Sequence, residues 1–287
     1  MKKYKICKIL LVILAIFLCV AFYELLGICV AYKKQPEVSN TTKKETKNGS
    51  WNECSENTER AVIIEKNPEA LLQRVRLIKN AKKEIILSTF AFQSDESGKL
   101  ILGALHDAAD RGVHIRLLVD GMESWIDMEG NPYFYGLSSH ENVEIKLYNK
   151  ANPLKPWKMM GRMHDKYLIA DGKRYILGGR NTYNYFLGDF PGHKNYDRDV
   201  LVVCDEPEKE NSVNQLLEYF ETIWEQEDSG HFHDNKKLAN RKSVKNAVLE
   251  LQNGYQKYFE ENKERICDTD YTDETFETEK IALVSNP

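Results

Sequence analysis

The chain has 287 residues, 42% of them hydrophobic, and a formal net charge of −4 at pH 7. This length allows one substantial domain with appendages, or two small domains. An acidic chain lacks the broad basic surface that nucleic-acid binding needs, which argues against nucleic acid as a partner. The charge is unevenly distributed, because basic residues dominate positions 146–180 and acidic residues dominate positions 205–228.

A long apolar stretch follows a basic N-terminus at residues 1–8. Residues 9–32 are interrupted only by Glu24, and roughly 20 apolar residues are enough to cross a bilayer as a helix. The lysines before this stretch predict a transmembrane anchor with its N-terminus in the cytosol and the main domain outside it, at the cell membrane. The alternative is a cleaved secretory signal, which places the main domain outside the cytosol as well.

Residues 33–60 are polar and lack apolar periodicity, which predicts a flexible linker. Cys54, Cys204 and Cys267 lie beyond the anchor, and an odd number of cysteines leaves at least one unpaired. A bridge between Cys54 and Cys267 is one candidate, but the spacing leaves its geometry open. The sequence has no CxxC pair or His–Cys cluster, so we expect no metal and no other cofactor.

Residues 61–228 alternate between two apolar patterns. Helical spacing of three and four occurs at 69–83, 97–111 and 214–226. Short, nearly continuous apolar runs that are typical of buried strands occur at 84–92, 113–119, 143–148, 163–170, 174–178 and 199–203. This order predicts an α/β domain with a parallel or mixed sheet covered by helices.

Residues 229–287 form the C-terminal part of the chain. A helix is expected over 241–265, and its apolar stripe must be covered by the parent domain, a second subunit or a missing piece of chain. The apolar residues within 279–287 predict a terminal strand.

The most informative pattern is His164-Asp165-Lys166, followed by Asp171 and Asn181. On an extended strand, residues two apart point the same way, so His164 and Lys166 share one face. This places a nucleophile or acid–base beside a fixed cation, as phosphodiester chemistry requires. The basic segment around the motif suits an anionic phosphate.

The pattern His-x-Lys-x4-Asp, followed by Gly-Gly-x-Asn, resembles the phospholipase D superfamily. The likeness is strongest to the amino-terminal half of cardiolipin synthase-type members. It runs from about residue 62 to 224 and includes the segments 88–121 and 195–203. The resemblance implies a mixed sheet between two helical layers, which is an α-β-α sandwich, and a membrane-anchored enzyme acting on glycerophospholipids. It implies no metal.

The resemblance also implies roles for individual residues. His164 attacks phosphorus to form a phosphohistidine, or protonates the leaving alcohol. Lys166 and Asn181 bind the non-bridging phosphate oxygens, and Asp171 orients the site and balances its charge. Three residues support the site, namely Gly178, Gly179 and Asp199.

The chain departs from this family because it contains a single motif. Members need two facing motifs, and the other histidines of this sequence lack a Lys two positions on. Either two chains pair as a homodimer, or a second half is missing from this chain. The apolar tail at 279–287 resembles the start of a second repeat and favours a split or incomplete enzyme.

Two other functions compete with the lipid enzyme. One is a metal-independent nuclease, which the acidity and the anchor argue against. The other is a non-catalytic half-enzyme that binds phosphate headgroups. Apolar residues within 125–135 and 157–160 could line an acyl-chain entrance or form part of the core.

Overall fold

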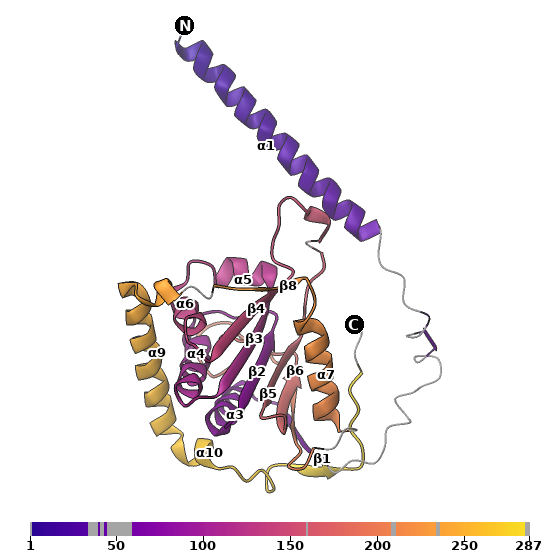
Figure 1. The fold of residues 1–287 in the computed structure, drawn as a ribbon, viewed down its shortest axis with the longest axis vertical. Coiled ribbons are helices and arrows are strands. Elements are labelled where there is room, and N and C mark those ends of the chain that lie inside the picture. Colours follow the sequence, from indigo (N-terminus) through magenta and orange to yellow (C-terminus); the bar gives the residue numbers. More distant parts are fainter. Residues whose placement is uncertain are drawn as a thin grey trace.

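The computed structural model describes residues 2–33, 40, 43–44, 59–158, 160–207, 211–233 and 236–284. Within these residues a nine-stranded sheet has the order β8-β4-β3-β2-β5-β6-β7-β1-β9. Helices cover both faces of the sheet, and α1 projects from one end of the domain (Figure 1). The expected α/β architecture with a mixed sheet flanked by helices is confirmed.

The strands are β1 (Glu59–Ile64), β2 (Glu84–Thr89), β3 (His114–Asp120), β4 (Val143–Tyr148), β5 (Lys166–Ala170), β6 (Arg174–Gly178), β7 (Asp199–Val203), β8 (Ser229–His231) and β9 (Phe276–Thr278). The helices are α1 (Lys2–Lys33), α3 (Asn67–Asn80), α4 (Glu96–Asp110), α5 (Gly121–Asp127), α6 (Pro132–Ser138), η2 (Pro156–Lys158), α7 (Ser212–Trp224), α8 (Lys236–Ala239), α9 (Lys242–Glu261) and α10 (Lys263–Cys267). Strands β2, β3 and β4 are mutually parallel, whereas β5, β6, β7 and β1 pair antiparallel.

Alternate side chains of the central strands point to opposite faces of the sheet. Ile85 and Leu117 lie on the face that packs against α3, α4, α6 and α9. Ile86 and Tyr167 lie on the other face, under Phe220 of α7. This alternation explains why the central strands read as continuous apolar runs, since both of their faces are buried.

Helix α9 packs its apolar stripe against α4 and α6 of the same domain. Of the three partners that the sequence left open for this stripe, the parent domain is therefore the one observed. Gly103 of α4 makes this packing possible. A Cβ at that position would lie 2.7 Å from both the Leu251 carbonyl oxygen and the Tyr255 Cβ. The predicted helix over 241–265 is divided at Asn262 into α9 and α10.

Two segments differ from the sequence-based expectation. Strand β1 begins at Glu59, inside the predicted linker, and pairs with β7. The terminal strand is β9, which pairs with β1, and residues 279–284 are not a strand. Ile281 and Leu283 instead lie against the α7 side of the core, where the Leu283 N–H donates to Gln215 Oε1 at 2.8 Å. Most of the predicted linker lies outside the described residues, as does Cys54.

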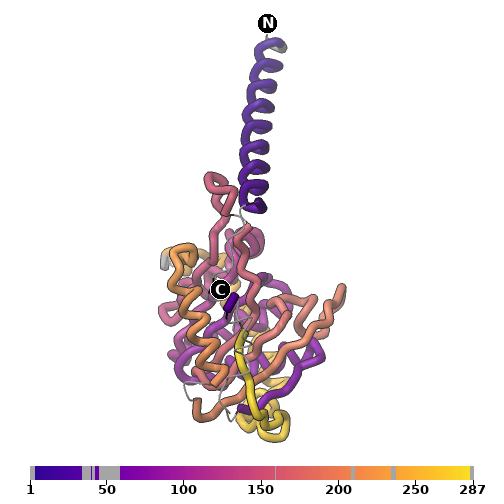
Figure 2. Tube along the Cα trace, turned by 90° about the vertical axis from the view of Figure 1, so that its right-hand side faces the viewer, coloured from indigo at the N-terminus to yellow at the C-terminus, as the bar shows by residue number. Residues whose placement is uncertain are grey.

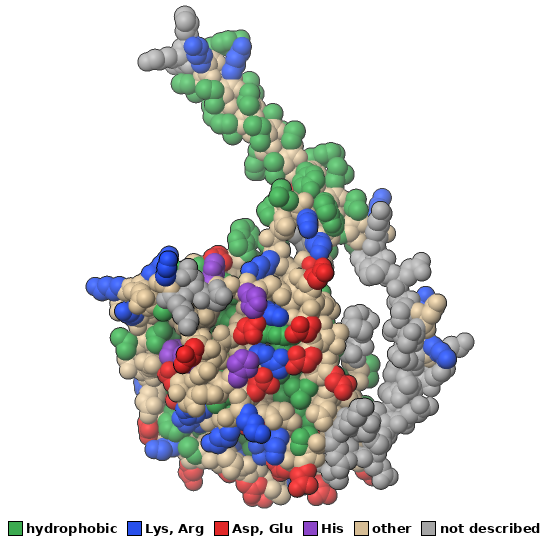
Figure 3. Space-filling view, viewed as in Figure 1, with side chains coloured by type: hydrophobic (Ala, Val, Ile, Leu, Met, Phe, Trp, Pro, Cys, Tyr) green, Lys and Arg blue, Asp and Glu red, His purple; other side chains and the backbone are tan. Residues whose placement is uncertain are grey.

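Helix α1 is long and apolar enough to cross a membrane by length and composition, over residues Tyr4–Lys33. Its surface is almost continuously hydrophobic beyond the lysines at its start (Figure 3). The last turns of α1 lie beside the loop between β4 and β5, as the two perpendicular views agree (Figures 1 and 2).

Candidate active site

The motif residues lie at one edge of the sheet, where β2 and β6 end and where β5 and β7 begin. Lys166, the first residue of β5, pairs with Thr89, the last residue of β2. Gly178 at the end of β6 pairs with Asp199 at the start of β7. Beyond the start of β5, the segments that follow β2 and β6 pair with each other in an isolated β-bridge between Phe92 and Thr182. Antiparallel insertion of β5 therefore brings three distant loops together.

His164 precedes β5 and is exposed to solvent. Its ring contacts the edge of the Phe90 ring, with 4.6 Å between centroids. Partial burial, and secondly the neighbouring Lys166 ammonium, lower the pKa of His164. The imidazole is therefore neutral near pH 7, which is the form with a nucleophilic nitrogen.

Lys166 is only 5% exposed. Its ammonium donates to the His164 carbonyl oxygen at 2.5 Å and lies 5.3 Å from the centre of the Phe90 ring. Burial lowers the pKa of Lys166 to about 8, and the carboxylates of Asp165 and Asp197 oppose that shift. A desolvated cation that is still charged at neutral pH binds an anionic oxygen more strongly than an exposed one does.

Asn181 lies in the loop after β6 and is buried, with 7% of it exposed. Its Oδ1 accepts the Ala91 N–H at 3.3 Å, and its side chain also hydrogen-bonds to Tyr183. Because Asn181 Oδ1 already accepts a backbone N–H, its amino group is the part that can donate to a phosphate oxygen.

Asp120 and Arg162 hold the segment that carries His164. The buried Asp120 carboxylate accepts the Met163 N–H at 3.0 Å and the Arg162 Nε–H at 2.9 Å. It also caps α5 by accepting the Met122 N–H. The Arg162 guanidinium in turn lies 4.9 Å from the Phe90 ring centre. Sequence reasoning did not find Asp120, although an Asp at the carboxyl end of a parallel strand and before a Gly was the available signal.

Asp171, to which the resemblance gives the role of orienting the site and balancing its charge, does not lie beside His164. Asp171 follows the last residue of β5, about 16 Å along the strand from Lys166. Its carboxylate accepts the backbone N–H groups of Lys82 at 2.8 Å, Lys83 at 2.7 Å and Glu84 at 3.0 Å. Its backbone has a φ of 55°, a left-handed conformation that Asp tolerates better than most residues. Asp171 therefore fixes the turn that leads into β2.

The glycines and Asp199 serve the packing of this edge. A Cβ on Gly178 would lie 2.0 Å from Asp199 Oδ1, and a Cβ on Gly179 would lie 2.1 Å from Asp197 Oδ2. Asp199 is buried and paired with Arg74 at 2.9 Å and with Arg180 at 3.3 Å. Asp197, which sequence reasoning passed over, is the carboxylate of this loop that partly opposes the lowering of the Lys166 pKa by burial.

A cavity of about 380 Å³ opens beside the motif on the α7 side of the sheet. It is lined by β5 and the residues just before it, by β6, by α7 and by the C-terminal segment. The lining residues are His164, Asp165, Lys166, Tyr167, Leu177, Gly178, Leu216, Tyr219, Leu283 and Val284. In this cavity the Tyr219 hydroxyl donates to Asp165 Oδ2 at 2.9 Å. No group of three or more His, Cys, Asp or Glu side chains suited to a metal ion occurs among the described residues.

The arrangement provides a neutral imidazole at the surface, a buried ammonium within two residues of it and an amide held by the backbone. These are a nucleophile or acid–base and two donors for anionic oxygens. The described part of this chain offers them once.

Comparisons with known proteins identify the family of this domain. The family model for the cardiolipin synthase, PLD-like domain matches residues 74–224. An uncharacterized protein of Helicobacter pylori strain J99 is 30% identical over 212 residues, which are 69% of this chain and 39% of the relative. Cardiolipin synthase C of Escherichia coli K12 is 29% identical over 171 residues, which are 55% of this chain and 34% of the relative.

A solved structure shares the fold. Phosphatidylserine synthase from Haemophilus influenzae Rd KW20 superposes with a TM-score of 0.52 at 17% identity, covering 77% of this chain and 48% of that one. This chain spans about two fifths or less of the length of these curated relatives. The match to the family model covers more than half of the chain and includes the edge that carries His164, Lys166 and Asn181. The chain therefore belongs to the phospholipase D superfamily, in the family of cardiolipin synthase-type, phospholipase D-like domains.

Proposed function

We propose that this chain is a membrane-anchored phosphodiester enzyme that acts on glycerophospholipids, by phosphatidyl transfer or by hydrolysis. The observation that carries the proposal is the pairing of an exposed, neutral His164 with the buried Lys166 ammonium at one sheet edge. Asn181 at the same edge supplies a second donor. Substrate lipids present a monoanionic phosphodiester, which matches one ammonium and one amide.

The reaction proceeds in two displacements. The imidazole nitrogen of His164 attacks phosphorus, a P–N bond forms, and the bond from phosphorus to the leaving alcohol oxygen breaks. That oxygen takes a proton from a general acid. Water or an acceptor alcohol then gives up a proton and attacks phosphorus, the P–N bond breaks, and His164 is regenerated. Lys166 and Asn181 stabilise the charge that develops on the non-bridging oxygens in both steps.

The general acid of the first displacement has to come from a second motif. This sequence contains a single His-x-Lys pair, and His164 cannot be nucleophile and proton donor in one displacement. A second copy of the chain, or a separately supplied half, would complete the site.

A lipid substrate is favoured over nucleic acid by two features. Helix α1 has the length and composition of a membrane span, and the lysines that precede it support a topology with the main domain outside the cytosol. The net charge of −4 argues against a polyanionic substrate, because binding a polyanion requires a broad basic surface.

The test is a product assay with the full chain in nanodiscs that contain phosphatidylglycerol. Phosphatidyl transfer yields cardiolipin and glycerol, and hydrolysis yields phosphatidic acid and glycerol. If a second copy of the chain supplies the second motif, the rate per chain should rise with protein density in the bilayer. The same protein assayed on single-stranded DNA without divalent metal tests the nuclease alternative.

Cleavage of DNA with no lipid product would replace the proposal by the nuclease. If no substrate is turned over at any protein density, while phosphatidylglycerol still binds and the binding weakens in Lys166→Met, the chain is a headgroup-binding half-enzyme. A rate per chain independent of protein density would contradict the need for a second half.

A further inference from the structure

The loop between β4 and β5, residues 149–163, reaches from the sheet to the anchor helix and returns to His164. The Tyr23 hydroxyl of α1 donates to the Leu154 carbonyl oxygen at 2.8 Å. About one turn further along α1, Gly27 allows a close approach of the loop, because a Cβ on Gly27 would lie 2.3 Å from Pro156 Cγ. Gly27 is buried, whereas most of α1 is exposed.

One face of α1 is directed at this loop. Glu24, Gly27, Ile28 and Ala31 are less exposed than their neighbours and recur at helical spacing. A carboxylate such as Glu24 is costly in hydrocarbon and is expected on a face that is covered by protein. The loop therefore docks on the face of α1 that carries Glu24.

The position of the contact along α1 sets the height of the loop relative to the bilayer. A span that starts after Lys8 and crosses about 30 Å of hydrocarbon ends near Ile28, since each residue rises about 1.5 Å. Gly27 then lies at the outer boundary, and Tyr23 lies about 7 Å inside it. A tyrosine hydroxyl at that depth needs a hydrogen-bond partner, which the Leu154 carbonyl supplies.

The loop carries apolar side chains that the protein leaves uncovered. Leu154 is 78% exposed, Trp157 46% and Met160 50%. Helix α5 lies at the same end of the domain in Figure 1 and exposes Trp125 and Ile126. Large apolar side chains gathered beside a membrane span, with tryptophan among them, suit the interface of a bilayer.

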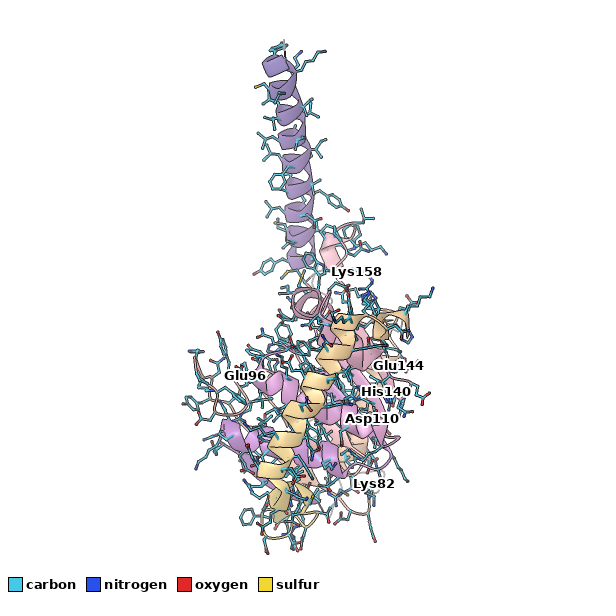
Figure 4. The ribbon with its side chains drawn as sticks, turned by 90° about the vertical axis from the view of Figure 1, so that its left-hand side faces the viewer. Lys82, Glu96, Asp110, His140, Glu144 and Lys158 are labelled. Carbon is cyan, nitrogen blue, oxygen red and sulfur yellow. The ribbon has the colours of Figure 1, made fainter. Side chains whose placement is uncertain are left out.

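We propose that the β4–β5 loop is a membrane-inserted element that binds the outer leaflet beside α1 and holds the His164 edge at the lipid headgroups. The partner is the lipid surface itself. The inference rests on the anchor in the proposed function, but it does not depend on which phosphodiester is cleaved. Figure 4 shows that Lys158 of this loop lies at the foot of α1 and that Lys82 lies near the opposite end of the domain.

The experiment measures how deeply a probe at position 154 or 82 enters the bilayer, and it does not depend on enzymatic activity. An environment-sensitive fluorophore is attached to Leu154→Cys, and separately to Lys82→Cys, in the full chain with its six native cysteines replaced by Ala. Each protein is reconstituted into phosphatidylcholine–phosphatidylglycerol vesicles, with or without lipid brominated near the middle of its acyl chains. The Leu154 probe should shift to the blue and be quenched by the brominated lipid. The Lys82 probe should show neither effect.

A pair of variants tests the docking on α1. Gly27→Leu places a side chain where Pro156 lies, so quenching of the Leu154 probe should fall toward the Lys82 level. Ala15→Leu adds a comparable side chain at an exposed position of α1 and should leave the quenching unchanged. The chain with its native cysteines provides a second readout, because lipid quenching should include a Trp157 contribution that Trp157→Phe removes.

The outcomes separate this inference from the anchor. Protein that fails to float with vesicles would remove the membrane span and the inference together. Protein that floats but shows equal, unquenched emission at positions 154 and 82 would overturn the inserted loop alone. Quenching that persists undiminished in Gly27→Leu would overturn the docking on α1.

Discussion

The motif His-x-Lys-x4-Asp spans the length of β5, and its residues at the two ends of the strand have opposite surroundings. At the first end His164 is exposed, and burial moves the pKa of Lys166 down to about 8. At the last end the Asp171 carboxylate is fully engaged by the backbone N–H groups of Lys82, Lys83 and Glu84. Polar side chains at a sheet edge can bind a substrate when their hydrogen-bonding groups are accessible. A side chain whose acceptors are already bound by backbone N–H groups stabilises the fold instead.

This comparison separates chemistry from architecture within one short motif. The antiparallel pairing of β5 with β2 places His164 and Lys166 beside the end of β2, and Asp171 beside its start. Asp171 fixes where β2 begins, and the register of β2 and β5 then fixes Lys166 opposite Thr89. The carboxylate acts on the site only through the position of the strands.

The largest expected effect is on catalysis at the first end. His164→Ala should reduce turnover of phosphatidylglycerol by about 10³-fold or more, because no other group of the chain replaces the nucleophile. The free energy of unfolding should change by less than about 0.5 kcal/mol, since the ring is exposed. Product formation and thermal unfolding measure the two effects.

His231→Ala removes an exposed histidine outside the site and is the matched control for this variant. Turnover retained in His164→Ala at more than a tenth of the wild-type rate would show that the imidazole is not the nucleophile.

The next effect concerns stability at the last end. Asp171→Asn should lower the free energy of unfolding by about 2 kcal/mol, because a charged acceptor of three backbone N–H groups is replaced by a neutral amide. Asn still tolerates the positive φ, so the loss reports the hydrogen bonds. Chemical denaturation measures it.

Below its unfolding transition, Asp171→Asn should keep most of the wild-type turnover, and Asp273→Asn at an exposed position should change neither quantity. A loss of turnover as large as that of His164→Ala, in protein that remains folded, would return Asp171 to a chemical role.

The smallest effect is a pH dependence that belongs to the first end alone. Lys166 loses its charge as the pH rises through about 8, so kcat/KM should fall about 10-fold for each further pH unit. Because burial lowers the pKa of His164, the decline of kcat/KM on the acid side should occur at a lower pH than for an ordinary histidine. Initial rates between pH 5 and pH 10 (~0.5 unit apart) define both limbs.

Lys166→Arg keeps a charge at every pH in this range, so its remaining activity should lack the alkaline limb. An alkaline limb that is unchanged in Lys166→Arg would assign it to another group.

The sequence by itself determined the class of the domain and predicted the chemistry of its motif. Continuous apolar runs and three-and-four spacing predicted most of the central strands and helices, because burial of both sheet faces demands those patterns. The order of residue types from His164 to Asn181 predicted the nucleophile and the oxygen donors. These are local features, and local features are visible in a linear chain.

Only the tertiary structure decided which polar residues serve the site. The antiparallel pairing of β5 with β2 places Asp171 beside the start of β2, where backbone N–H groups bind its carboxylate. The close pairing of Asp199 with Arg74 and Arg180 made it a buried structural carboxylate. Asp120 became the residue that holds the His164 segment, although it lies 44 positions earlier in the chain. Contacts between residues so far apart depend on strand order and direction, which the pattern of one sequence does not encode locally.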